Sequence, residues 1–363
     1  MRFWIPSKSG QSNNLLLWKV DAMKNPALFE TMTPEEFRAR RRQKYLNLEY
    51  YRLNQKDLDE SIKGQLELIE RDKAEGDPSP SGQSGVFGYK LDLLKLHYTA
   101  GEPIEELKPY YAEVLKAWKV YLDAHAKYVL YLEKKFGDEL EKTKPPLIFE
   151  DVECFRQVME LVGLALLLGD GVALRQLVHD FRYYRHTDML YEALITPAVP
   201  DPDKETTEYF HEVPYSPLID AFLVGTTQEA AGASIRQYLK SWYKAFDGTG
   251  WHNGHLDAVP GQYMPYQGYW PFDAAAIAVL YDIDDTPSRS HLLYAKDFAD
   301  WARENKSVER IRPIFRKKPQ GRIPAKPGRD MAQGGRASGK SQGLCRFRWQ
   351  SRRGVEARGC PPP

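Results

Sequence analysis

The chain has 363 residues with 51 Lys and Arg, 50 Asp and Glu, 42% hydrophobic residues and only 3 Cys. This composition is typical of one or two soluble globular domains, and it excludes a collagen-like, a disulfide-stapled or a fully disordered protein.

The near-neutral total hides a strong asymmetry between the body of the chain and its C-terminal end. Residues 316–363 hold 13 Lys and Arg against only Asp330 and Glu356, a net charge of +11, which leaves residues 1–315 at −10. An acidic body repels nucleic acid and anionic membranes and attracts basic partners. We therefore expect a cationic partner, with neither nucleic acid nor a membrane as a ligand of the body.

Two apolar patterns bear on the compartment of the protein. Residues 1–14 contain no apolar run of the length found in a signal peptide. The segment Val152 to Leu168 has an uninterrupted apolar core of only eight residues, Leu161 to Leu168, against the ~20 needed to span a bilayer. We predict a buried core helix there and a cytoplasmic protein.

In chain order, the first predicted helix begins after Thr33, a capping residue followed by Pro34 and two glutamates. Its apolar residues recur every three or four positions, which predicts one continuous helix to about Ala74. The next stretch, residues 75–88 (EGDPSPSGQSGVFG), is rich in Gly, Ser and Pro and reads as a flexible loop. A second helix is predicted from Tyr89 to about Tyr98.

The rest of the body repeats helical patterns separated by Gly and Pro turns, without β-type alternation. The predicted helices are 104–136, 151–168, 172–195, 217–224, 228–246, 272–281 and 294–304. This pattern predicts an all-α fold of two packed helical subdomains. Their expected bounds are 31–146 and 147–310, after an N-terminal extension (1–30) and before a disordered basic tail (316–363) rich in Gly and Pro.

Enzymatic chemistry finds little support in the sequence. Trp251-His252-Asn253-Gly254-His255 has a His-x-x-His spacing, but it lies in a Gly-containing loop, and a third ligand such as Asp273 or Asp284 is not fixed by position. The doublet His179-Asp180 lacks identifiable companion ligands, and no phosphate-binding loop or nucleophile-elbow motif occurs. We expect no catalytic residues, no metal and no cofactor.

The densest pattern is Tyr263 to Asp285, where aromatic residues lead into an Ala-rich helix. The small side chains of this helix predict close approach by another helix, and its aromatics suit a core cap. Asp282, Asp284 and Asp285 follow the helix end, where negative charge is unfavourable. Two explanations stay open: Asp284 or Asp285 caps the next turn, or these acids face a basic partner.

Five short strings in the chain resemble a known family. They are 266–276 (YQGYWPFDAAA), 283–285 (IDD), 294–298 (YAKDF), 45–51 (YLNLEYY) and 98–107 (YTAGEPIEEL). The first three resemble the C-terminal domain of the PoNi immunity proteins (formerly DUF1911), and the last two resemble the N-terminal PoNi domain (formerly DUF1910). The resemblance covers about residues 35–305, and Asp273, Pro271 and Ala295 depart from the family pattern.

The resemblance implies a helical, non-catalytic immunity protein that binds and neutralises a PoNe-type DNase toxin delivered by a type VI or related secretion system. Together with the acidic body, it suggests toxin-binding candidates in the C-terminal half, which are Asp273, Asp282, Asp284, Asp285, Tyr266, Trp270, Trp251 and His252. A helical scaffold and a metal-dependent hydrolase remain the alternatives, and the sequence leaves the oligomeric state open.

Overall fold

The structure is a computed structural model that describes residues 27–137 and 144–316. Every regular element in these ranges is a helix and no strand occurs there, which confirms the predicted all-α class. The α-helices are α1 (Ala27–Glu30), α2 (Pro34–Arg40), α3 (Leu48–Glu75), α4 (Ser81–Ala100), α5 (Ile104–Phe136), α6 (Val152–Leu167), α7 (Gly171–Asp180), α8 (Met189–Ile195), α9 (Glu212–Asp220), α10 (Gln228–Ala245), α11 (Phe272–Leu280) and α12 (Lys296–Glu304). Short 3-10 turns occur at η2 (Arg182–Tyr184), η3 (Thr196–Ala198), η4 (Gly254–Leu256) and η5 (Thr286–Ser288).

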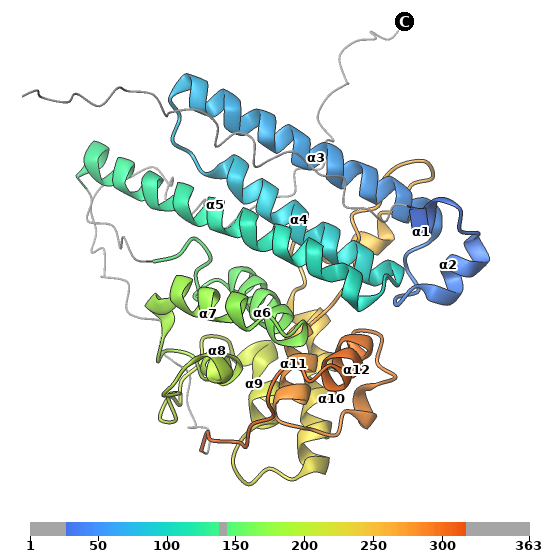
Figure 1. Cartoon of the computed structure of the whole chain (residues 1–363), viewed down its shortest axis with the longest axis vertical. Helices are drawn as coiled ribbons and strands as arrows, with labels where there is room; N and C mark the ends of the chain where they lie inside the picture. The colour runs from blue at the N-terminus through green and yellow to red at the C-terminus, as the bar shows by residue number, and fades with distance from the viewer. Residues whose placement is uncertain (1–26, 138–143, 317–363) are drawn as a thin grey trace, which may run out of the picture.

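Three long helices form a layer over a group of shorter helices. In Figure 1, α3, α4 and α5 lie side by side above α6 to α12, with α4 contacting both α3 and α5. Below them α6 packs against α11, α7 and α12. Buried apolar side chains from both groups belong to one continuous core. The predicted subdomain boundary at residues 146 and 147 stays a prediction.

The predicted first helix is in fact two helices, α2 and α3. Thr33 caps α2 as expected, through reciprocal bonds with Glu36, but the helix ends at Arg40. Asn47 then caps α3, its side chain accepting a hydrogen bond from the amide of Tyr50. Tertiary bonds hold the intervening segment out of the helix, because the Arg42 amide donates to the Thr99 carbonyl at 2.8 Å. The predicted single continuous helix was therefore wrong, because hydrophobic periodicity takes no account of hydrogen-bond partners that lie far away in the sequence.

The predicted loop 75–88 is also shorter than expected, because α4 already begins at Ser81. A Cβ atom at Gly82 would lie 2.6 Å from Ile69, and one at Gly85 would lie 2.6 Å from Gln65. These glycines therefore let α4 approach α3 closely, a role that outweighs their poor helix propensity.

Other boundaries agree with the sequence or differ for local reasons. Helix α5 spans the predicted range, and α6 begins after the Asp151 cap. The predicted helix 172–195 is split into α7 and α8, since Asp188 caps α8 after the left-handed residue His186. No helix among the described residues is long and apolar enough to cross a bilayer. The basic tail from residue 317 and the first 26 residues lie outside the described residues.

Candidate functional site

Helix α11 lies at the centre of the predicted interaction region and is buried along its whole length. The expected close approach by another helix occurs at Gly163 of α6, where an added Cβ atom would lie 3.2 Å from the backbone nitrogen of Asp273. Helix α10 contacts it as well. The helix has nine residues and is therefore roughly 13 Å long. It separates the predicted site into an aromatic end and an acidic end.

Asp273, at the start of α11, is an internal group rather than a surface one. Only 3% of it is exposed, and its carboxylate accepts hydrogen bonds from the Tyr238 hydroxyl at 2.8 Å and from the amide of Ala274 at 2.9 Å. Burial raises the pKa of Asp273 to about 7. A toxin cannot reach this carboxylate from the surface of the molecule as it stands.

Tyr266 and Trp270, at the aromatic end of α11, are buried too. Trp270 donates its indole proton to the Thr99 hydroxyl at 2.7 Å, and the Tyr266 hydroxyl donates to the Gln43 side chain. The Trp270 ring also lies 4.7 Å from that of Tyr98 in a T-shaped pair. These aromatics join the C-terminal loop to the N-terminal helices, so the core-cap explanation describes them better than an exposed interface.

Two polar residues that sequence reasoning missed organise this junction. The buried Gln43 amide donates to the Tyr269 carbonyl at 2.8 Å and accepts from the Tyr269 amide at 3.0 Å. Asn54 donates to the Tyr266 carbonyl at 2.9 Å and accepts from the Met264 amide at 2.7 Å. A polar residue on an apolar helix stripe, as Asn54 is between Tyr51 and Leu58, is the sequence signal that could have revealed it.

At the acidic end, Asp282 and Asp284 are exposed. Asp282 adopts a left-handed backbone conformation (φ 51°), and its carboxylate pairs with Arg310 at 2.9 Å, both side chains being more than half exposed. The Asp284 carboxylate accepts the amide of Thr286 at 3.0 Å, and hydrogen bonds from Thr286 lower its pKa. Asp284 therefore caps the following turn and still faces solvent.

Asp285 differs from its neighbours because only 5% of it is exposed. Its carboxylate accepts hydrogen bonds from the Tyr294 hydroxyl at 2.6 Å and from Arg303 at 2.8 Å. Arg289 lies 3.4 Å from its other oxygen. This internal ion cluster ties the loop to α12, so Asp285 stabilises the fold instead of presenting a free charge.

The two loop histidines have separate partners. His255 Nδ1 lies 2.8 Å from the Tyr269 hydroxyl. The pKa of His255 is lowered, mainly by burial and to a smaller extent by the charge of His252. His252 stacks on Tyr243 with ring centroids 4.2 Å apart, and the half-buried Trp251 joins an aromatic cluster with Trp242. No group of three or more His, Cys, Asp or Glu in residues 27–137 and 144–316 is placed to hold a metal.

In the His179-Asp180 doublet, Asp180 has a structural role. Asp180 is buried, and its carboxylate accepts hydrogen bonds from the Trp118 indole at 3.0 Å and from the Gln176 amide at 2.8 Å. A carboxylate engaged in this way anchors α7 to α5.

Comparison with known protein families identifies the family of this helical protein. Residues 54–179 match the family described as PoNe immunity protein (PoNi), N-terminal, and residues 186–298 match PoNe immunity proteins (PoNi), C-terminal. The chain belongs to the PoNi family. PoNi proteins confer immunity to a toxin and are not catalytic, so this chain is an immunity protein that binds a cognate PoNe toxin.

Among solved structures, this PoNi is similar to protein PA2201 from Pseudomonas aeruginosa, with a TM-score of 0.52 and 20% sequence identity. The alignment covers 73% of this chain and 92% of PA2201, which shows a shared fold. No curated protein matches the chain.

Proposed function

We propose that this PoNi protects its producer in the cytoplasm by binding a DNase toxin delivered through a type VI or related secretion system. We assign the first contact to the exposed carboxylates of Asp282 and Asp284, which follow α11. The net charge of −10 on residues 1–315 supports this assignment, because a DNase needs a basic surface to hold phosphates.

The observation that carries the proposal is that the backbone of both residues is held in place by α10. The Gln228 side chain donates to the Asp282 carbonyl at 3.1 Å and accepts from the Asp284 amide at 2.9 Å. Gly232 of α10 lies so near that a Cβ atom there would be 2.7 Å from the Asp284 carbonyl oxygen. A braced loop loses little conformational freedom when a partner binds, so its charges are presented at low entropic cost.

The pairing of Asp282 with Arg310 does not prevent such a contact. Because both side chains are more than half exposed, the ion pair contributes little to stability and can exchange with a basic group of the toxin.

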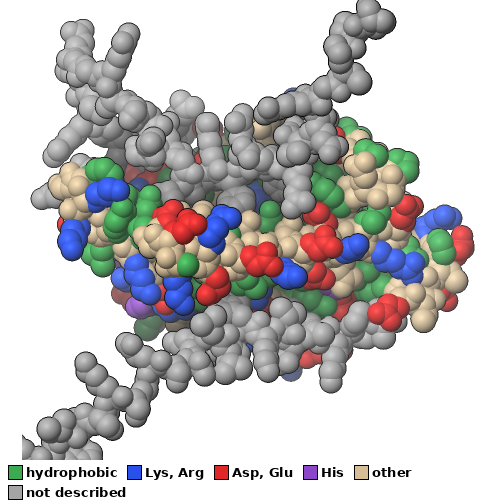
Figure 2. All heavy atoms as spheres, turned by 90° about the horizontal axis from the view of Figure 1, so that it is seen from above, with side chains coloured by type: hydrophobic (Ala, Val, Ile, Leu, Met, Phe, Trp, Pro, Cys, Tyr) green, Lys and Arg blue, Asp and Glu red, His purple; other side chains and the backbone are tan. Residues whose placement is uncertain are grey.

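The face of the long helices is a weaker candidate. Figure 2, which looks onto the molecule from that side, shows acidic and basic side chains interspersed. Helix α3 carries two exposed ion pairs, Lys56 with Glu60 and Lys63 with Glu67, at 3.9 and 4.0 Å. On a surface with charges of both signs the electrostatic potentials largely cancel, so it attracts a basic protein only weakly over long distances.

A coexpression experiment tests the proposal. We expect the cognate nuclease to be encoded in the gene next to this one. That nuclease is expressed in a susceptible bacterium with and without this protein, and an unrelated DNase serves as the control toxin. We expect survival and a purified complex only with the neighbouring nuclease. Cell death despite soluble immunity protein, with no complex formed, would contradict the proposed function.

A further inference from the structure

A cavity of about 130 Å³ lies between α4 and α6 and is also lined by the loops at residues 250–251 and 265–270. Its walls therefore come from both matched family regions, 54–179 and 186–298. Glu153, Gln157 and Asp92, at its rim, are half-buried, whereas Glu160 in its wall is 3% exposed. The proposed contact at Asp282 and Asp284 does not use this cavity.

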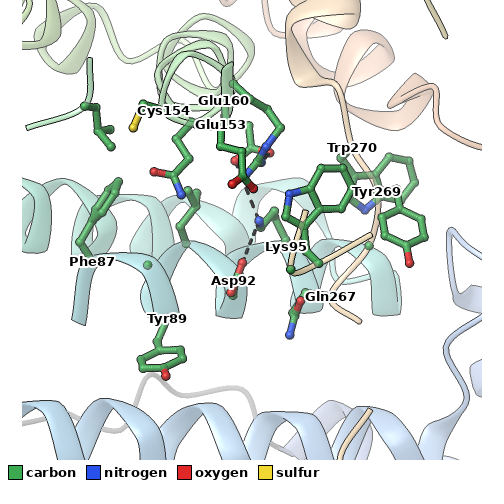
Figure 3. Close-up of a pocket in the computed structure, with 18 of the residues that line it drawn as sticks. Phe87, Tyr89, Asp92, Lys95, Glu153, Cys154, Glu160, Gln267, Tyr269 and Trp270 are labelled. Carbon is green, nitrogen blue, oxygen red and sulfur yellow. Dashed lines mark hydrogen bonds and ion pairs between the residues drawn. The ribbon is translucent and has the colours of Figure 1, made fainter. Parts of the chain in front are cut away.

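Five charged side chains line the cavity: Asp92, Lys95, Glu153, Arg156 and Glu160. Figure 3 shows Glu153 and Glu160 projecting from α6 toward Lys95 of α4. Lys95 Nζ lies 2.8 Å from Asp92 Oδ1, and the Arg156 guanidinium donates to Glu160 Oε1. Three acids against two bases leave the cavity with one uncompensated negative charge.

One buried oxygen in this cluster has no hydrogen-bond donor. Glu160 Oε2 lies 3.9 Å from Lys95 Nζ, beyond hydrogen-bond distance, and no other group among the described residues donates to it. A buried carboxylate oxygen without a hydrogen-bond donor from the protein is costly unless an entering group supplies one. The cavity thus offers an acceptor to a group that enters it.

The aromatic wall suits a cation as well. The Arg156 guanidinium already lies 5.1 Å from the centroid of the Trp251 ring, and Tyr269 and Trp270 line the same cavity. Aromatic faces attract ammonium and guanidinium groups through their negative quadrupole. A volume of 130 Å³ is close to that of cavities that hold one benzene-sized molecule. It is therefore large enough for the tip of one side chain.

We propose that this cavity binds a lysine or arginine side chain of the toxin, with Glu153 and Glu160 as the acceptors. The inference rests on the proposed function, since it names a second contact of the same partner. A basic side chain supplies the missing charge and the missing donor together, and a neutral amide supplies only the donor.

Two variants test the cavity by different means. Glu153→Gln removes a rim charge on a half-buried side chain. Gly88→Leu blocks the space, because a Cβ atom at Gly88 meets no atom within 4 Å and Gly88 lines the cavity. Glu67→Gln and Gly64→Leu are matched controls on α3, where both positions are exposed and Gly64 is equally open. Circular dichroism confirms that each variant is folded.

The first measurement is the affinity of each variant for the neighbouring nuclease. We expect binding to weaken roughly 30-fold or more in Glu153→Gln and Gly88→Leu, and to stay unchanged in both controls. Wild-type affinity in both cavity variants would overturn the inference while leaving the proposed function intact, and would indicate a cavity filled with water.

A second measurement decides the inference if the wild type does not bind that nuclease, in which case the proposed function fails. N-acetyl-L-arginine methylamide is titrated into the protein, and the indole NH signals are followed by NMR. Saturable binding that is absent in Gly88→Leu, and absent with the glutamine analogue, supports the cavity as a site for a cationic side chain. No saturable binding overturns it.

Discussion

The hydroxyl of Tyr238 on α10 donates a hydrogen bond to the buried carboxylate of Asp273 on α11, at 2.8 Å. Because burial raises the pKa of Asp273 from 3.8 to about 7, the native state holds this proton more tightly than the unfolded chain does. The contribution of Asp273 to stability is therefore complete below pH 4 and is lost as the pH rises to about 7.

The Asp273→Asn variant should flatten this dependence. Between pH 4 and 8 the wild type should lose more unfolding free energy than the variant, by at most about 4 kcal/mol. Urea denaturation at several pH values measures the difference, with the exposed Asp257→Asn as control. Parallel pH profiles for the wild type and Asp273→Asn would contradict the assignment. Burial also raises the pKa of Asp188, to about 6, but Asp188 affects the pH dependence of the wild type and of the variant equally.

Neutralising Asp282 and Asp284 together should slow toxin association without unfolding the protein. Asparagine tolerates the left-handed backbone at Asp282, so the loop should keep its shape. At low salt we expect the on-rate of Asp282→Asn with Asp284→Asn to fall several-fold, and the difference to shrink at high salt. Stopped-flow fluorescence gives these rates.

The matched control for that experiment is Glu60→Gln with Glu67→Gln on α3, which removes the same charge from another exposed face. If it slows association equally, total charge and not the loop controls the encounter. A faster dissociation in the loop variant would instead show that one of the aspartates is buried against the toxin.

Replacing Asp285 should affect stability rather than recognition. Asp285→Ala leaves Arg303 and Tyr294 without their buried acceptor, and we expect a loss of about 3–5 kcal/mol of unfolding free energy. Asp284→Ala removes only the exposed cap on Thr286 and should cost much less unfolding free energy than Asp285→Ala. Equilibrium denaturation compares the two, and equal losses would argue against the internal ion cluster.

Two helix-capping glycines provide a test of close packing. Gly76 (φ 72°) and Gly101 (φ 95°) both end a helix in the left-handed region, but only Gly101 is crowded, a Cβ atom there lying 2.3 Å from the Arg40 carbonyl oxygen. We expect Gly76→Ala to cost about 1–2 kcal/mol and Gly101→Ala about 2 kcal/mol more. Similar thermal stabilities would show that the Arg40 segment moves freely.

Local signals predicted much of the fold. Thr33 caps α2 as predicted, and the helix predicted from residue 151 begins after the Asp151 cap; both caps are made by bonds within three residues, which a sequence pattern can reveal. The same is true of the α5 range, since its amphipathic stripe and flanking turns are contiguous. The helical class and the PoNi family followed from such local patterns.

Contacts between distant residues decided the rest. Arg42 and Gln43 leave the helix because their partners, Thr99 and Tyr269, lie far along the chain. For the candidate site, the sequence drew attention to the acidic segment that follows α11 but could not separate its buried acids from its exposed ones. Asp273, Asp284 and Asp285 are the same residue type within 13 positions, yet α10 encloses the first and Arg303 of α12 neutralises the third. Burial depends on which helices cover a side chain, and only the tertiary structure determines that.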